Sequence, residues 1–171
     1  MQCLSKRGSD SNLSREDRNM IPLDVFLYIG IIIFFAVFME FVAWVTHKYV
    51  MHGFLWILHE DHHRPRSLGF QKNDLFAVFF SGIAILMFLL GNITGQFFIT
   101  SIAIGVTLYG IGYVLFHDIM FHRRIRGIKL RASTKYFKRI VNAHAYHHQN
   151  SEKSKGTAFG FLYAPAKYNV N

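Results

Sequence analysis

The sequence predicts an all-α integral membrane protein with three to four transmembrane helices. Of its 171 residues 51% are hydrophobic and only 17% are charged, yet the formal net charge is +9. Soluble domains average about 25% charged residues, and a chain that is both apolar and basic is typical of a membrane protein with one cationic face. We therefore expect the lipid bilayer to be a partner of this chain, and we expect it to bind no nucleic acid.

Residues 1–20 are polar and mixed in charge, so we expect a disordered lead. Met20 stands directly before the first apolar segment, and a native start at Met20 is the alternative to a start at Met1. We expect residues 21–165 to form one membrane domain and residues 166–171 to form a short tail.

The first span is predicted around Val25–Met39, which contains no charge, and the apolar character continues past Glu40 to Val45. Together these residues reach the length of about 20 that crosses a bilayer. No cleavage site of small residues follows, so we expect a retained span and not a signal peptide.

A second apolar region covers the 42 residues Leu75–Phe116 and contains no charged side chain. This length suits two crossings of about 20 residues each. Gly91–Gln96 holds two glycines and an asparagine, which favour a turn. We therefore predict a hairpin of Leu75–Leu90 and Phe97–Phe116. A fourth, partial insertion by Tyr49–Leu58 is the alternative to three spans.

The basic residues predict the orientation. Of the 19 Lys and Arg, four lie in residues 48–72, eleven follow Phe116, four lie in the lead and none lies in the hairpin turn. Three crossings place 48–72 and the carboxyl-terminal region on one side, which the positive-inside rule makes cytoplasmic. The basic stretch Arg123–Arg139 suits either a helix on the anionic inner leaflet or a docking face for an acidic redox partner.

The histidines carry the chemical signal. The single cysteine, Cys3, excludes a disulfide framework, a zinc ribbon, a cysteine-ligated iron–sulfur cluster and a dithiol pair within one chain. All ten histidines fall in four short groups that alternate between H-x4-H and H-x2-H-H. They are His47, His52, His59, His62, His63, His117, His122, His144, His147 and His148.

The spacings predict how these rings project. Residues three and four apart share one face of an α-helix, so each H-x2-H-H group projects together, and His52 can join His59 if the helix is continuous. Five residues correspond to about 140° around an ideal helix, so the members of an H-x4-H pair diverge. Either the helix is distorted there, or each member serves a different ion. The simplest arrangement is that two metal ions share the ten imidazoles.

Three crossings deliver all four histidine groups to the same face, which predicts a cytoplasmic histidine-rich di-metal site. Imidazole suits iron, zinc and copper. A set without cysteine disfavours a structural zinc site, and it differs from the glutamate-rich soluble di-iron bundles. We favour redox iron, because the site lies at the mouth of a membrane from which a hydrocarbon substrate would arrive.

Four carboxylates are candidates for a supporting role. Glu60, Asp61 and Asp118 adjoin histidines and can accept the second ring N–H of a ligand, although Glu60 and Asp61 suit solvation equally well. Glu40 lies seven residues before His47, on the same helical face within a span. It can serve the site or extend its head group to the interface.

The residues that flank the histidines resemble a known family. The resemblance rests on Phe41–Trp56, His59–Pro65, Tyr113–Asp118, His144–His148 and Gly156–Leu162. At these segments the sequence resembles the short bacterial β-carotene hydroxylases of the fatty-acid hydroxylase/sterol-desaturase superfamily. The histidine pattern alone indicates the superfamily, and the flanking residues and small size indicate the carotene branch.

The resemblance spans Ile21 to Pro165 and implies a membrane hydroxylase domain. It implies a non-haem di-iron monooxygenase with O2 as co-substrate, hydroxylating β-carotene at C-3 of each β-ionone ring to give β-cryptoxanthin and then zeaxanthin. Each of the ten histidines would carry over as an iron ligand, with no catalytic residue beyond the metal site. The implied location is a bacterial cytoplasmic membrane.

Electrons must then come from outside, because the sequence has no cysteine cluster and no Gly-x-Gly-x-x-Gly motif. A ferredoxin and a ferredoxin reductase are the implied donors, and an acidic ferredoxin would suit the basic face. Phe54, Trp56, Gly110 and Gly112 either line a substrate channel or serve ordinary packing.

Other functions fit the same pattern. A carotenoid ketolase, or a fatty-acyl or sterol hydroxylase or desaturase, would share the histidine spacing and differ in its cavity. A histidine-rich metal transporter is the alternative from another class. It is disfavoured because transporters place ionisable residues near the midplane, whereas these histidines lie beyond the ends of the predicted spans.

Overall fold

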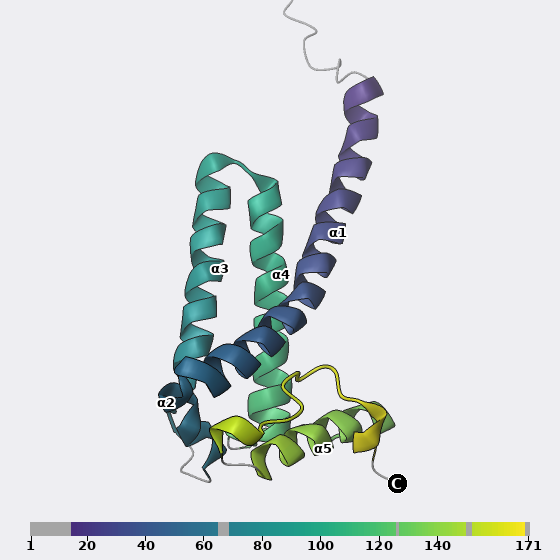
Figure 1. The fold of residues 1–171 in the computed structure, drawn as a ribbon. Helices are drawn as coiled ribbons and strands as arrows, with labels where there is room; N and C mark the ends of the chain where they lie inside the picture. Colours follow the sequence, from purple (N-terminus) through teal and green to yellow (C-terminus); the bar gives the residue numbers. More distant parts are fainter. Residues whose placement is uncertain (1–14, 65–68, 126, 150–151, 170–171) are drawn as a thin grey trace, which may run out of the picture.

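The computed structural model describes residues 15–64, 69–125, 127–149 and 152–169, and within these ranges every regular element is a helix. Three long helices stand together, and the short elements gather at one end of them (Figure 1). In chain order the elements are α1 (Arg15–Val45), a π-helix (Thr46–Phe54), α2 (Trp56–His59), a 3-10 turn (Glu60–His63), α3 (Asp74–Thr94), α4 (Phe97–Tyr113), a second π-helix (Val114–Phe121), α5 (Lys135–Gln149) and 3-10 turns at Lys153–Lys155 and Ala166–Tyr168.

Three segments are long and apolar enough to cross a membrane: Leu23–Phe54, Asp74–Thr94 and Phe97–Phe121. The chain is therefore an integral membrane protein, and the prediction of three spans is confirmed. Tyr49–Leu58 forms the end of the first segment and the turn into α2, so it is not a fourth crossing in the part of the chain that the structure describes.

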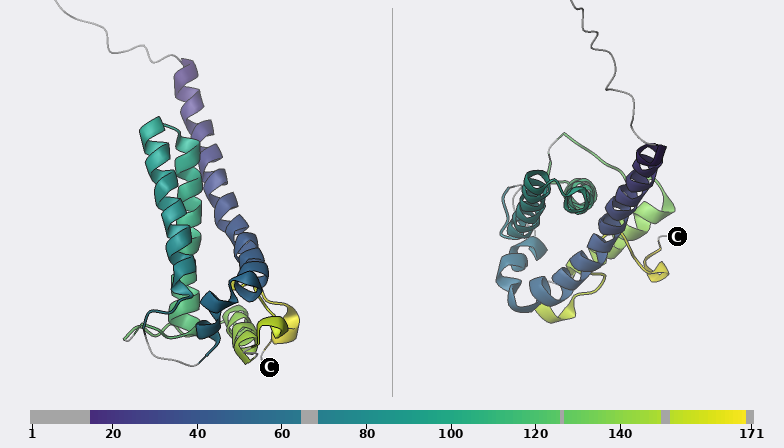
Figure 2. Two further views of the ribbon diagram at one scale, coloured as in Figure 1. Left: turned by 60° about the vertical axis from the view of Figure 1, so that its left-hand side comes forward. Right: turned by 90° about the horizontal axis from the view of Figure 1, so that it is seen from above.

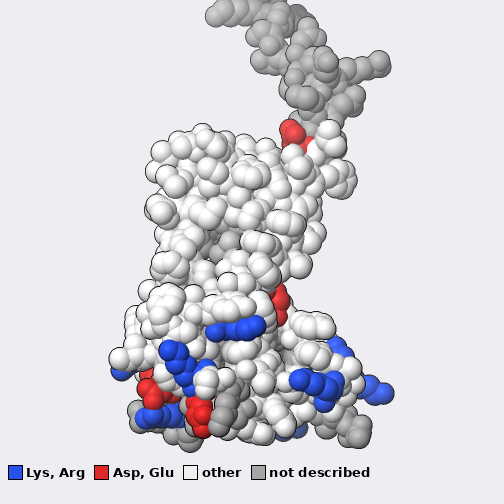
Figure 3. Space-filling model, viewed as in Figure 1, with Lys and Arg blue, Asp and Glu red and all other residues white. Residues whose placement is uncertain are grey.

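Apolar side chains cover the outside of these spans. Phe34, Val37 and Phe79 are examples of large side chains that are more than half exposed, as expected of surfaces that face lipid. Among the described side chains on the face drawn in Figure 3, Lys and Arg lie only at the end where the short elements gather. This distribution agrees with a protein whose apolar part lies in the bilayer and whose charged part lies outside it.

Helix α4 packs against both α1 and α3. Small residues permit the close approach: a Cβ atom added to Gly105 would lie 2.7 Å from the Ile32 carbonyl oxygen and 2.9 Å from Phe35 Cβ. Toward its N-terminus α1 leans away from the α3–α4 hairpin (Figure 1). At the opposite end, α5 and the carboxyl-terminal segment lie beneath the spans (Figure 2).

The hairpin turn is shorter than predicted. Helix α3 continues through Gly91 to Thr94, and only Gly95 and Gln96 separate it from α4. Gly91 does not break the helix; instead its missing side chain leaves room for Thr100 of α4, whose Oγ1 would lie 2.4 Å from an added Cβ. Gly95 ends the helix with φ of 66°, a left-handed conformation that suits glycine.

Two predicted boundaries differ from the structure. Helix α1 begins at Arg15, within the lead that was expected to be disordered, and continues through residues 15–22 into the first span at Leu23. Residues 1–14 lie outside the described part. The predicted tail is packed, since Tyr168 is only 5% exposed and its carbonyl accepts a hydrogen bond from Asn142 Nδ2 at 2.9 Å. Residues 166–168 therefore pack against the end of the helices.

The basic stretch 123–139 is not a single helix. Arg123 and Gly127 have positive φ angles of 53° and 90° and turn the chain after the second π-helix. Helix α5 begins only at Lys135. Its inner face, with Ile140 and Ala143, is buried against the end of the bundle.

Candidate metal centre

Both H-x4-H pairs lie in π-helices, Thr46–Phe54 and Val114–Phe121 with His122 directly after it. A π-helix joins residue i to residue i+5, so residues five apart lie one above the other on the same face. The ring centroids are 5.2 Å apart for His47 and His52, and 4.6 Å apart for His117 and His122. Of the two alternatives, the distorted helix is therefore the correct one.

Two clusters of histidines result. In each, every residue offers one ligand atom, and these atoms lie within 4.8 Å of one another. The first cluster consists of His47, His52, His59, His63 and His147; the second cluster consists of His62, His117, His122 and His144.

The H-x2-H-H groups are shared between the clusters, against the expectation that each would project as a unit. His59 and His63 join the first cluster and His62 the second, because the chain passes from α2 into a 3-10 turn at Glu60. In α5, His144 joins the second cluster and His147 the first. The prediction of two metal-binding groups is supported by this arrangement.

His148 lies beside both clusters and in neither. Its ring centroid is 4.6 Å from that of His63, 4.7 Å from that of His122 and 4.5 Å from that of His144. Its Nε2 atom is buried and has no hydrogen-bond partner among the described residues. A buried ring nitrogen without a partner is costly, and a metal ion would satisfy it.

Backbone carbonyls orient three rings of the first cluster. Each ring donates a hydrogen bond from Nδ1 to the carboxyl-terminal segment: His47 to Phe159 O (2.8 Å), His52 to Lys153 O (3.1 Å) and His147 to Thr157 O (2.6 Å). A carbonyl oxygen only accepts, so the proton of each neutral ring is on Nδ1 and Nε2 carries a lone pair.

The Nε2 atoms of the first cluster point at one another. His52 Nε2 lies 3.2 Å from His147 Nε2, although both carry lone pairs, and His47 Nε2 lies 3.0 Å from His59 Nε2. Two lone pairs facing each other need a cation between them. Nitrogens about 2.1 Å from one ion and at right angles would be about 3.0 Å apart, so the donor set and its spacing fit a metal ion.

Side chains orient the second cluster. His62 Nδ1 donates to Gln71 Oε1 at 3.0 Å, and His117 Nδ1 donates to Asp118 Oδ1 at 2.8 Å. The two Nε2 atoms are then 3.1 Å apart and again face each other. Acceptors at the second ring nitrogen fix the tautomer of a ligating histidine and raise its basicity.

Burial keeps these rings neutral. Loss of solvation and the neighbouring histidines lower the pKa of His59 to about 2 and that of His122 to about 3. Burial lowers the pKa of His62 and of His147 to about 4. A metal binds the neutral imidazole, so at neutral pH no proton has to be displaced.

The four candidate carboxylates lie in different places. Asp118 accepts from His117, as expected. Glu60 pairs with Arg64 on the exposed side of the 3-10 turn, and Asp61 Oδ2 accepts from the backbone N–H of Lys72 at 2.8 Å.

Glu40 contacts the carboxyl-terminal segment and Tyr109. In these hydrogen bonds and ion pairs, none of the partners of Glu40, Glu60 and Asp61 is a histidine ring.

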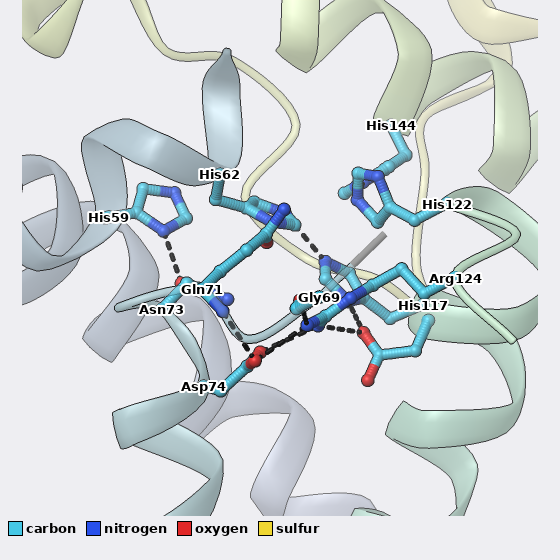
Figure 4. Close-up of polar contacts among 11 residues, drawn as sticks. His59, His62, Gly69, Gln71, Asn73, Asp74, His117, His122, Arg124 and His144 are labelled. Carbon is cyan, nitrogen blue, oxygen red and sulfur yellow. Dashed lines mark hydrogen bonds and ion pairs between the residues drawn. The ribbon is translucent and has the colours of Figure 1, made fainter. Parts of the chain in front are cut away.

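The segment before α3 supplies acceptors that the sequence analysis did not identify. His59 Nδ1 donates to Asn73 Oδ1 at 2.6 Å (Figure 4).

Arg124 makes a bidentate pair with Asp74 at 2.6 and 2.7 Å and lies 3.5 Å from Asp118 Oδ1. Its ion pairs raise the pKa of Arg124 above its usual value. The available signal was the polar run Gln71–Asp74 placed between a histidine group and a span.

An apolar cavity of about 590 Å³ extends from the histidines between the three spans. Along α3 it is lined from Phe76 to Phe88, a distance of about 18 Å at 1.5 Å per residue. Gly110 lines it, whereas Phe54, Trp56 and Gly112 do not. At one end it reaches four histidines that represent both clusters: His47, His59, His117 and His144.

Comparisons with known proteins agree with this site. The sequence model of the family described as fatty acid hydroxylase matches residues 32–165. The beta-carotene hydroxylase of Pantoea ananas is 40% identical over 144 residues, which are 82% of this chain and 80% of that protein. That of Pseudescherichia vulneris is 41% identical over 136 residues, 78% and 75% of the two chains.

A plant protein is also similar. The chloroplastic beta-carotene 3-hydroxylase of Gentiana lutea is 36% identical over 135 residues, 76% of this chain and 41% of that protein. No solved structure matches the chain.

Proposed function

Because this chain belongs to the fatty acid hydroxylase family, we propose that it is a β-carotene hydroxylase that hydroxylates C-3 of each β-ionone ring. β-Carotene would be converted to β-cryptoxanthin and then to zeaxanthin. The observation that carries the proposal is the apolar cavity that runs from both histidine clusters between the spans. An apolar, elongated substrate can enter it from the bilayer with one ring toward the histidines.

The ten histidines would hold two iron ions. Bound there, the iron would supply the activation of O2 and the oxidation of the ring C–H bond. The donor set supports this assignment, because all its members are neutral nitrogen ligands and none is a thiolate.

Backbone carbonyl groups and side chains around the clusters do the positioning. Phe159 O, Thr157 O, Asn73, Gln71 and Asp118 hold the second ring nitrogens of the histidines. The mostly apolar lining excludes water from the reacting ring and fixes which carbon faces the metals.

The histidine end would face the bacterial cytoplasm, because fifteen of the 19 Lys and Arg belong to the regions on that side of a three-span chain. A reduced ferredoxin, itself reduced by a ferredoxin reductase, would supply two electrons for each turnover. An acidic ferredoxin is complementary to this basic end.

Expression in a host that accumulates β-carotene but does not hydroxylate it tests the proposal. We expect β-cryptoxanthin and zeaxanthin in the separated pigments. Keto-carotenoids would instead identify a ketolase. Unchanged β-carotene, with the protein inserted, loaded with iron and supplied with ferredoxin, would contradict carotenoid hydroxylation and direct the search to acyl and sterol substrates.

A further inference from the structure

Glu40 is a carboxylate within the first span that is held entirely by hydrogen-bond donors of this chain. Its Oε1 accepts three successive backbone N–H groups, from Phe161 (3.1 Å), Leu162 (2.9 Å) and Tyr163 (3.1 Å). Its Oε2 accepts the hydroxyl of Tyr109 at 2.9 Å. Charge-assisted hydrogen bonds of this kind are about twice as strong as neutral ones, so Glu40 ties the carboxyl-terminal segment to α1 and α4.

The segment is shaped for this contact. Gly160 lies against the carboxylate: an added Cβ would be 2.8 Å from Glu40 Oε1 and 3.3 Å from the Tyr163 carbonyl oxygen. No side chain fits there unless the segment moves away from Glu40. A second feature is Ala158, whose φ of 56° is unusual for a residue other than glycine.

The same segment orients the first cluster. Thr157 and Phe159, on either side of Ala158, accept the Nδ1 protons of His147 and His47. Phe159 is two residues before Phe161, the first donor to Glu40. The contacts therefore form a closed circuit: Glu40 of α1 holds the segment, and the segment holds the ring of His47, which lies in the π-helix that directly follows α1.

We propose that Glu40 is a positioning residue for the first cluster. By fixing residues 157–163 it sets the tautomer and direction of His47 and His147, and so controls the metal affinity of that cluster alone. The second cluster does not depend on this segment, because His62 and His117 are held by Gln71 and Asp118. This inference rests on the proposed metal centre.

The test is a Co²⁺ titration of the full chain in lipid nanodiscs, followed by visible absorption and by metal analysis. The wild-type chain is expected to bind two ions. Glu40→Gln keeps the shape of the side chain and removes its charge, whereas Glu40→Ala removes all four hydrogen bonds. We expect Glu40→Ala to weaken one of the two sites about ten-fold, at the lower end of the effect of lost partners around a metal site, and Glu40→Gln to weaken the same site less.

Two further variants identify the affected site. Gly160→Ala disturbs the same contact from the segment instead of from Glu40. It is expected to weaken the same site as Glu40→Ala, and combining the two substitutions should cause no further loss of metal affinity. Asp118→Asn is expected to weaken the other site, and its effect should add to that of Glu40→Ala. Asp24→Asn, an exposed carboxylate at the far end of the first span, is the control and should change neither affinity.

The outcomes separate the two proposals. A wild-type chain that binds fewer than two ions contradicts the metal centre itself, and with it this inference. Two ions in the wild type, with both sites weakened equally by Glu40→Gln or neither site weakened by Glu40→Ala, overturn the role of Glu40 alone. Selective loss at one site supports it, since a general loosening of the fold would affect both.

Discussion

At the scale of single residues, the site depends on how each imidazole is held at its second nitrogen. His147 is fully buried, with no exposed surface, and its Nδ1 donates to Thr157 O at 2.6 Å. Its Nε2 lies 3.2 Å from that of His52. Both ring nitrogens are thus engaged, Nδ1 by the carbonyl oxygen of Thr157 and Nε2 by the other rings of the first cluster.

His147→Ala is expected to abolish turnover and to remove the ion of the first cluster, while membrane insertion is unchanged because the residue lies outside the three spans. Carotenoid analysis, metal content and membrane fractionation check the three parts. Gln149→Ala, an exposed position of the same helix, is the control. Turnover at the wild-type rate in His147→Ala would refute the assignment of this residue as a ligand.

At the scale of elements, the hairpin of α3 and α4 and the crossing of α1 over α4 create the cavity. Gly105 and Gly112 are both in α4, but their surroundings differ. An added Cβ at Gly105 would clash with the backbone of α1, whereas at Gly112 it would meet nothing within 4 Å. The contact between α1 and α4 therefore depends on one glycine and not on the other.

We predict that Gly105→Ala lowers the free energy of unfolding by about 1–3 kcal/mol, the usual cost of overpacking, and that Gly112→Ala changes it by less than about 0.5 kcal/mol. Thermal unfolding of both variants in the same detergent measures the difference. Equal stabilities would show that α1 does not pack on α4 at this point.

At the scale of the whole molecule, charge and hydrophobicity are separated along the axis of the spans (Figure 3). Among the side chains that the structure describes, the basic ones gather at the end that holds the histidines, which an electron donor would approach in the proposed reaction. Attraction between a basic face and an acidic protein raises the association rate and is screened by salt.

We therefore predict that the rate of reduction by an acidic ferredoxin falls as ionic strength rises, while reduction by a small uncharged reductant does not. Stopped-flow reduction of the metal-loaded protein in nanodiscs at several salt concentrations measures both rates. A ferredoxin rate that does not respond to salt would contradict docking through the basic face.

The sequence by itself determined the helical membrane fold, the number of spans and the presence of a histidine site at one end. These follow from properties that act along the chain: apolar length against bilayer thickness, the distribution of Lys and Arg, and the repeated histidine spacing. Boundaries such as the start of α1 and the end of α3 were less accurate, because helix ends depend on neighbours such as Thr100 beside Gly91.

Only the tertiary structure decided how the histidines are shared and held. The spacing left two explanations for His47 and His52, and the π-helix selected one because its wider turn aligns residues five apart. The division of His59 and His62 between clusters depends on the 3-10 turn and on where α5 packs. The carbonyl oxygens of Thr157 and Phe159 have no sequence signature at all, since every residue carries the same carbonyl group and only the path of the folded chain directs it at a ring.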